Sequence, residues 1–101
     1  MSTTHSAAAR VFGERLRAER LRLGLSQEDV AHLSEMHVTN VGKLERGMAN
    51  PSLVTIVRLA GALNVDPGSL LAGLTLDQLP ARTHRLTAAE LIRERKAREG
   101  R

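Results

Sequence analysis

The sequence contains no cysteine, tryptophan or tyrosine, and Phe12 is its only aromatic residue. Without cysteine, the chain can form neither a disulfide framework nor a thiolate metal site. Because aromatic side chains are so scarce, the core must be built from leucine, valine, isoleucine and alanine. The alternating apolar pattern of strands is missing too, as are the Asn-Gly and Asp-Gly dipeptides of tight hairpins. We therefore expect an all-α fold.

Long apolar stretches are also missing. No run approaches the ~18 residues that a membrane span needs, and the start MSTTHSAAARVFGERLR has no secretory apolar segment. We expect a cytoplasmic protein without membrane contact. The sequence also lacks metal-ligand spacing, a phosphate-binding glycine loop and a nucleophile paired with a base. We therefore expect no metal, no cofactor and no enzymatic activity; surface or capping roles account for the dispersed histidines His5, His32, His37 and His84.

The net charge of +4 is unevenly distributed. Residues 1–81 hold 8 basic and 8 acidic side chains, whereas residues 82–101 hold 7 basic and 3 acidic ones. The whole excess therefore lies in the C-terminal tail. Bulk charge says little about the folded part, and the positions of individual residues must decide its function.

Apolar spacing and end signals predict five short helices. The first runs from about Ala9 to Leu23, and Gly24 follows as a left-handed stop. The second helix opens after the N-cap Ser26. The third lies within MHVTNVGKLERG and ends at Gly47.

The fourth helix opens after Ser52, and Asp66-Pro67 starts a short fifth helix. The proline-containing stretch TLDQLPARTHR is interpreted as a linker. A sixth helix is expected from about Ala88 to Arg98, with a Thr87–Glu90 capping box and a Leu86–Leu91 staple. The expected organisation is a flexible N-terminus (1–8), a helical domain (9–74), and a linker with a basic C-terminal helix (75–101).

The third predicted helix carries residues that weaken a helix. Gly42 costs roughly 0.5–1 kcal/mol relative to alanine, and its neighbours Val38, Thr39 and Val41 are β-branched. With Val41 on the core side, the opposite face collects Thr39, Gly42, Lys43 and Arg46. An ordinary solvated face carries strong helix formers such as glutamate and alanine. This face has no long acidic side chain and therefore suits the DNA major groove. We predict that Gly42 lets the helix approach DNA closely.

The segment LGLSQEDVAHLSEMHVTNVGKLERGMANPSLVTIVRLAGALNV resembles the helix-turn-helix domain of the phage lambda and 434 repressors, their Cro proteins and many bacterial regulators. The resemblance covers about Phe12 to Leu74. Its strongest parts are LSQEDVA, LERG, NPSL and LAGALNV. It implies a five-helix lambda-repressor-like DNA-binding domain with an additional C-terminal helix. It further implies a repressor-type transcription regulator that binds double-stranded inverted-repeat DNA as a homodimer, with the third helix in the major groove.

The resemblance also implies roles for individual residues. Those matching base-reading positions are Val38, Thr39 and Lys43, with His37 and Asn40 beside them. Those matching DNA-backbone positions are Gln27, Arg46, Asn50 and Ser52. Arg20 and Glu45 match an ion pair between the first and third helices; the alternative is two unrelated surface charges. The sequence departs from the family at Glu35, where the turn usually has glycine, and at His37, a weak cap.

Several alternatives stay open at the level of the sequence. Leu70, Leu71 and Leu74 are the expected dimer interface, or else they close the core. The basic tail is a solvated helix, an arm on the DNA backbone, or a docking surface for a second copy or a protein partner through Ala88, Leu91 and Ile92. Two rival functions remain: an antitoxin or adaptor that docks on a protein, and a restriction–modification controller, which shares an ERG…SL stretch.

Overall fold

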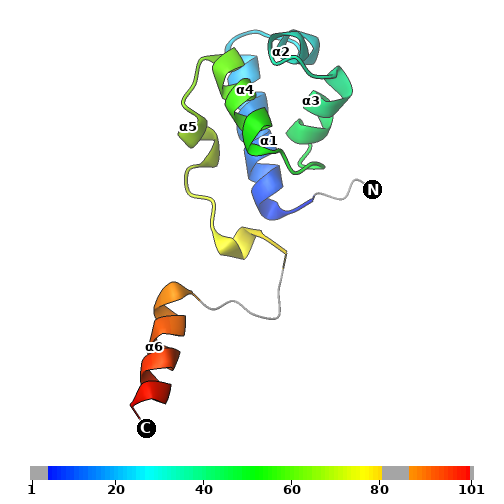
Figure 1. The fold of residues 1–101 in the computed structure, drawn as a ribbon. Helices are drawn as coiled ribbons and strands as arrows, with labels where there is room; N and C mark the ends of the chain where they lie inside the picture. The colour runs from blue at the N-terminus through cyan, green and yellow to red at the C-terminus, as the bar shows by residue number, and fades with distance from the viewer. Residues whose placement is uncertain (1–4, 81–86, 101) are drawn as a thin grey trace.

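The computed structural model describes residues 5–80 and 87–100, and all regular structure in these ranges is helical (Figure 1). The elements are α1 (Ala7–Arg22), α2 (Gln27–Leu33), α3 (Val38–Glu45), α4 (Leu53–Leu63), α5 (Pro67–Leu71), the 3-10 helix η1 (Leu76–Gln78) and α6 (Ala88–Glu99). The predicted all-α class, with five helices and an additional C-terminal one, is confirmed.

Side-chain caps begin α2, α4 and α5 where the sequence predicted them, while α1 begins two residues earlier than expected, at Ala7 after a Ser6 cap. The Ser26 hydroxyl accepts the Asp29 backbone N–H at 3.0 Å, and the Asp29 carboxylate accepts the Ser26 N–H at 2.8 Å, which completes a capping box. Because that backbone N–H donates to the carboxylate, the pKa of Asp29 lies below its ordinary value. At the starts of α4 and α5, the Ser52 and Asp66 side chains accept the backbone N–H groups of Thr55 and Gly68, without a reciprocal bond.

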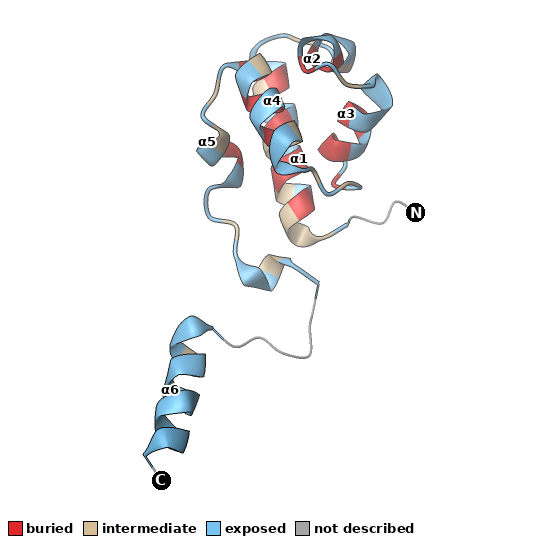
Figure 2. Cartoon of the chain, viewed as in Figure 1, coloured by how far each residue is buried: buried red, intermediate tan, exposed pale blue. Residues whose placement is uncertain are grey.

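The core joins one face of each of the first five helices. α1 packs against α3 and α5, while α4 packs against α2 and α5. Figure 2 shows the buried residues concentrated on the facing sides of these helices. The cluster is aliphatic apart from a single ring, and its members are Phe12, Leu16, Val30, Ala31, Val41, Leu44, Ile56, Leu59, Ala60, Leu63 and Leu70.

A close crossing of α1 and α3 fixes the position of the third helix. Gly13 lies in the middle of α1, and a Cβ atom built there would be 2.2 Å from the Leu44 carbonyl oxygen. Gly47, directly after α3, has φ +72°, and a Cβ there would be 2.7 Å from the Arg10 Cα. The two backbones therefore touch over the end of α3, and only glycine fits at either contact.

The C-terminal part differs from the predicted linker. Residues Leu76–Gln78 form the helix η1 instead of irregular chain, and the Thr75 N–H that precedes it donates to the Gln78 side chain at 2.7 Å. The helix α6 begins as predicted, since the Thr87 hydroxyl accepts the Glu90 N–H at 3.2 Å. Leu86 of the expected staple lies outside the described residues. Among the described helices, none combines the length and apolar character needed to cross a lipid bilayer.

Candidate nucleic-acid interface

The outer face of α3 is open, while its inner face is fixed in the core. Val41 is fully buried and Leu44 is 4% exposed. On the other side Thr39, Asn40 and Lys43 are exposed. The predicted division of this helix into a core face and an outer face therefore holds for these residues.

The first turn of α3 begins at His37, which is exposed and makes no side-chain cap. The N–H groups at the start of the helix are therefore not satisfied by this side chain. Val38, which follows, is 40% exposed. Val38 and His37 therefore stand with Thr39 and Lys43 on the accessible side of the helix.

Gly42 corrects one prediction. It is buried, whereas the sequence placed it on the outer face. A Cβ atom at this position would lie 3.0 Å from Nη1 of Arg46 and 3.6 Å from Oε1 of Gln27. The glycine therefore makes room for two side chains of the protein itself, which lie over the α3 backbone. Residue spacing along the helix could not predict this burial, because it does not show that Arg46 folds back over Gly42 or that α2 contributes a neighbour.

Arg20 and Glu45 form the expected ion pair between α1 and α3. The Arg20 Nε donates to one carboxylate oxygen at 2.6 Å and its Nη2 donates to the other at 2.9 Å. The third nitrogen, Nη1, donates to the backbone carbonyl of Leu25 at 2.9 Å. Arg20 is 8% exposed and Glu45 is 7% exposed. This bidentate, nearly buried pair ties the end of α3 both to α1 and to the chain entering α2.

The electrostatics of Glu45 favour its ionised form. Burial by itself raises the pKa of this carboxyl, but hydrogen bonds from Arg20 and Gln27, with the charges of Arg20 and Arg17, outweigh that effect and lower the pKa. The pKa of Arg20 is raised in turn, first because its guanidinium donates to Glu45. Both groups therefore keep their charges at neutral pH.

Gln27 connects α2 to the same network. Its Nε2 donates to Glu45 at 3.0 Å, and the side chain is half-buried. An amide nitrogen carries two N–H donors, so this bond leaves one donor at the edge of the exposed α3 face. The sequence predicted a phosphate contact for Gln27 but missed its bond to Glu45. The spacing of the two residues gives no signal for such a bond.

The turn between α2 and α3 keeps a glycine-type backbone although it carries glutamate. Glu35 has φ 55°, in the left-handed region. The N–H of Met36 donates to the Ala31 carbonyl at 2.9 Å, and the N–H of Glu35 donates to the His32 carbonyl at 3.3 Å. This pair of bonds is the Schellman motif that ends many helices. Glu35, which stands where the family usually has glycine, therefore adopts the left-handed conformation at the cost of backbone strain.

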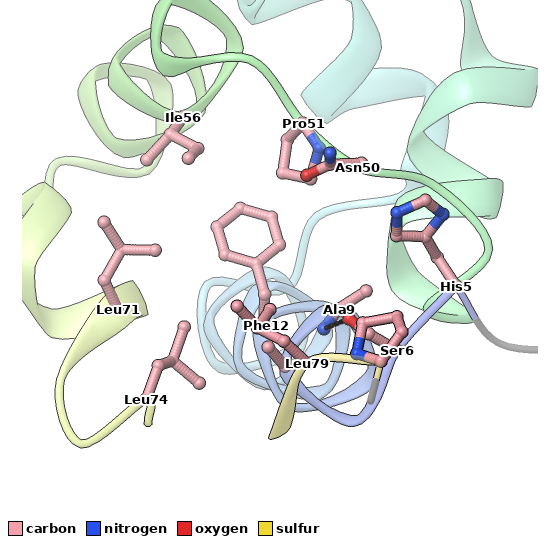
Figure 3. A pocket seen from close by; sticks show the side chains of 12 residues that line it. His5, Ser6, Ala9, Phe12, Asn50, Pro51, Ile56, Leu71, Leu74 and Leu79 are labelled. Carbon is pink, nitrogen blue, oxygen red and sulfur yellow. Dashed lines mark hydrogen bonds between the residues drawn. The ribbon is translucent and has the colours of Figure 1, made fainter. Parts of the chain in front are cut away.

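The loop before α4 carries the remaining predicted DNA-backbone residues. Asn50 is exposed, next to Pro51 at the rim of a pocket (Figure 3). The Ser52 hydroxyl accepts the Thr55 N–H at 3.1 Å and donates to the Thr55 hydroxyl at 3.0 Å. The Ser52 hydroxyl therefore acts as a helix cap. The Asn50 side-chain amide takes part in none of the hydrogen bonds of the described residues.

The predicted dimer residues of the fifth helix do not form one outward face. Leu70 is 1% exposed and belongs to the core, so its assignment to an interface is wrong and core closure describes it. The helix α5 ends at Leu71, before Leu74. Leu71 and Leu74 line the same pocket of about 160 Å³ as Phe12 and Ile56 (Figure 3). Their side chains therefore face the protomer's own α1 and α4, with Leu71 36% exposed.

The sequence and fold of this chain are similar to those of known proteins. A model of the helix-turn-helix family matches residues 16–70. The control protein C.BamHI of Bacillus amyloliquefaciens is 37% identical over 67 residues, which are 65% of this chain and 83% of that protein. The solved restriction-modification controller protein C.AhdI from Aeromonas hydrophila is 48% identical, with a TM-score of 0.62 over 63% of this chain and 97% of its own.

A repressor solved on DNA is similar as well. The P22 c2 repressor, in complex with a synthetic operator, is 28% identical, with a TM-score of 0.59 over 62% of this chain and 96% of its own. The residues that the family model matches, 16–70, contain α3 and the side chains of Arg20, Gln27 and Glu45 that hold it. The likeness therefore extends to the part of the fold that carries the exposed face.

Proposed function

The chain belongs to the helix-turn-helix family of DNA-binding transcription regulators that includes the lambda-type repressors, and from this we propose that it binds inverted-repeat DNA sequence-specifically as a homodimer. The third helix, α3, enters the major groove of each half-site. One observation carries the proposal: α3 has an exposed face of short and basic side chains, while its other face is locked by the core and by the Arg20–Glu45 pair.

The exposed side chains have the chemistry of base readers. The Lys43 ammonium can donate to guanine O6 and N7, and the Thr39 methyl can pack on the methyl of thymine. The amide of Asn40 can bond adenine at N6 and N7, as asparagine commonly does. Val38 offers an apolar contact, with His37 beside it. Because the core and the Arg20–Glu45 pair already hold the α3 backbone in place, little conformational entropy of that backbone is lost when these groups bind DNA.

Backbone contacts are assigned to residues around this face. Arg46 lies over Gly42 beside Gln27, so a guanidinium and a free amide N–H are brought together at one edge of α3. Asn50 supplies an amide from the loop before α4, and the N-terminal end of α4 near Ser52 supplies backbone N–H groups. Phosphate contacts of this kind fix the register of the protein on DNA without reading its sequence.

Selection of bound sequences from random duplex DNA tests this proposal. We expect an enriched inverted repeat, with half-sites whose centres lie about 10 base pairs apart. Binding should weaken steeply as salt rises, because phosphate contacts release counterions. A selection that enriches no motif at low salt contradicts the proposal.

A narrower role is favoured by the similarity to two control proteins, C.BamHI and C.AhdI. C.AhdI is a restriction-modification controller protein, and we propose that the present chain controls genes of the same kind. The selected motif gives the test. It should occur in the promoter next to the chain's own gene, with nuclease and methyltransferase genes beside it. A motif found only upstream of unrelated genes contradicts this role and leaves DNA binding intact.

A further inference from the structure

The outer face of α4 is apolar although it is exposed. Leu53 is 73% exposed, Val54 58% and Val57 51%. The opposite face of the helix, around Leu59, is buried in the core. Within α4, Arg58 is the single charged residue. Exposed apolar surface of this kind commonly marks a site where another molecule docks, and no described residue covers this face of α4.

Gly61 on the same face has no close neighbour among residues 5–80 and 87–100. A glycine inside a helix costs about 1 kcal/mol relative to alanine, and the chain accepts this cost at Gly13 because a Cβ there would be 2.2 Å from the Leu44 carbonyl oxygen. At Gly61, no described heavy atom would lie within 4 Å of an added Cβ. A close approach by a second molecule would account for Gly61 as the α3 backbone accounts for Gly13.

Residues 53, 57 and 61 form one ridge along the helix, because residues four apart share a face. Their side chains decrease in size from leucine through valine to glycine. Two copies of this ridge match when they run antiparallel with Val57 on the two-fold axis. Leu53 of each copy then lies over Gly61 of the other, and Val57 lies against Val57. The large end of each ridge thus fills the space at the small end of the other. Such self-complementarity is what a two-fold interface requires.

We propose that the outer face of α4, formed by Leu53, Val54, Val57 and Gly61, docks against the same face of a second copy of this chain, with the two α4 helices antiparallel. The inference rests on the homodimer of the proposed function and names its surface. Ridges of residues four apart pack into each other at about −50°. The single cation Arg58 lies beside Val54 at the rim, so no charge is buried at the axis.

The position of this face favours a second copy over another partner. The face begins directly after Asn50 and Ser52, which the proposed function places at the DNA backbone, so a second copy seated there lies beside the same DNA.

Sedimentation equilibrium of the full chain tests the inference, first with Val57→Lys. Two lysine ammonium groups would face each other at the axis, and we expect the dimer dissociation constant to rise at least about a hundredfold. Leu21→Lys is the matched control, because Leu21 is 53% exposed on α1 and the variant carries the same added charge. It should dimerise as the unaltered chain does. Equal dimerisation of both variants overturns the inference.

A size exchange tests the antiparallel pairing itself. Gly61→Leu alone places leucine against Leu53 of the other copy and should weaken the dimer about tenfold or more. Leu53→Ala alone leaves a void. The double variant Leu53→Ala with Gly61→Leu restores one large and one small side chain at each contact and should recover most of the loss. Additive loss in the double variant overturns the antiparallel pairing, even where Val57→Lys is monomeric.

The outcomes separate this inference from the proposed function. Val57→Lys should still prefer the selected half-site over random DNA, with lower affinity, because α3 is untouched. If the unaltered chain enriches no motif, DNA reading fails whatever the oligomeric state. If it enriches a motif but Val57→Lys dimerises normally, the dimer uses another surface and this inference alone is overturned.

Discussion

The contact between α1 and α3 predicts a large effect for the smallest possible change, Gly13→Ala. The added Cβ would be 2.2 Å from the Leu44 carbonyl oxygen and 2.8 Å from that of Glu45. The shorter distance falls about 0.8 Å short of the 3.0 Å that real Cβ atoms keep. Both neighbours are backbone atoms, so no side chain can rotate away. The two helices must separate.

The magnitude follows from two opposing effects. Forced overpacking of a core costs typically about 1–3 kcal/mol, while alanine improves the helix by roughly 0.5–1 kcal/mol over glycine. Because the overlap is with backbone atoms, the upper part of the overpacking range applies, about 2–3 kcal/mol, and we expect a net loss of about 1–2.5 kcal/mol in the free energy of unfolding. In a domain of this size each kcal/mol corresponds to a fall of about 4–8 °C in Tm.

Denaturant unfolding followed by circular dichroism measures this loss. Ala18→Gly is the matched control, because Ala18 is exposed on the same helix and reports intrinsic propensity alone. If propensity governed both positions, the two substitutions would have opposite signs. We expect both to destabilise. A Gly13→Ala variant as stable as the unaltered chain would refute the argument that this glycine sets the position of α3.

Three further predictions concern the support of α3. Gly42→Ala should leave the free energy of unfolding unchanged or slightly raised, because the added Cβ meets only movable side-chain atoms, the nearest being Arg46 Nη1 at 3.0 Å. The same substitution should displace Arg46 and weaken DNA binding several-fold in a titration. Glu45→Gln should cost about 3 kcal/mol at neutral pH. Because the folded pKa of Glu45 is lowered, the pair's contribution is present above the unfolded pKa of about 4.3 and is lost as pH falls through the folded pKa. Unfolding of the unaltered chain should therefore depend more steeply on acid than that of the variant. Glu35→Gly should raise Tm, since glutamate at φ 55° costs about 1 kcal/mol; an unchanged or lower Tm contradicts the strain.

Much of the fold was accessible from the sequence because it is encoded in local signals. Caps at Ser26, Ser52 and Asp66 depend on residues within one helical turn, and each occurs where it was predicted. The core face of α3 also follows from spacing within eight residues. The sequence was less informative where helices meet. The burial of Gly42 depends on Arg46 folding back and on α2 lying alongside. Neither can be predicted from the spacing of apolar residues within α3.

The same limit explains the correction at Leu70. A leucine on a short amphipathic helix is compatible with a core or with an interface, and only the packing of α5 against α1 and α4 distinguishes them. The Arg20–Glu45 pair was accessible only through resemblance to a family, because the two residues are 25 positions apart. Gly13 did carry a signal, because a glycine inside the helix-forming stretch VFGERLR weakens the helix unless a close neighbour requires it.

The central claim is that the exposed face of α3 reads base edges, and binding of Lys43→Ala to a series of single-base variants of the selected site tests it most directly. We expect the substitution to cost about 1–3 kcal/mol on the preferred sequence and to remove the preference at one position of each half-site, leaving the others intact. An equal loss on every sequence, with all preferences retained, would make Lys43 a backbone contact and contradict the account.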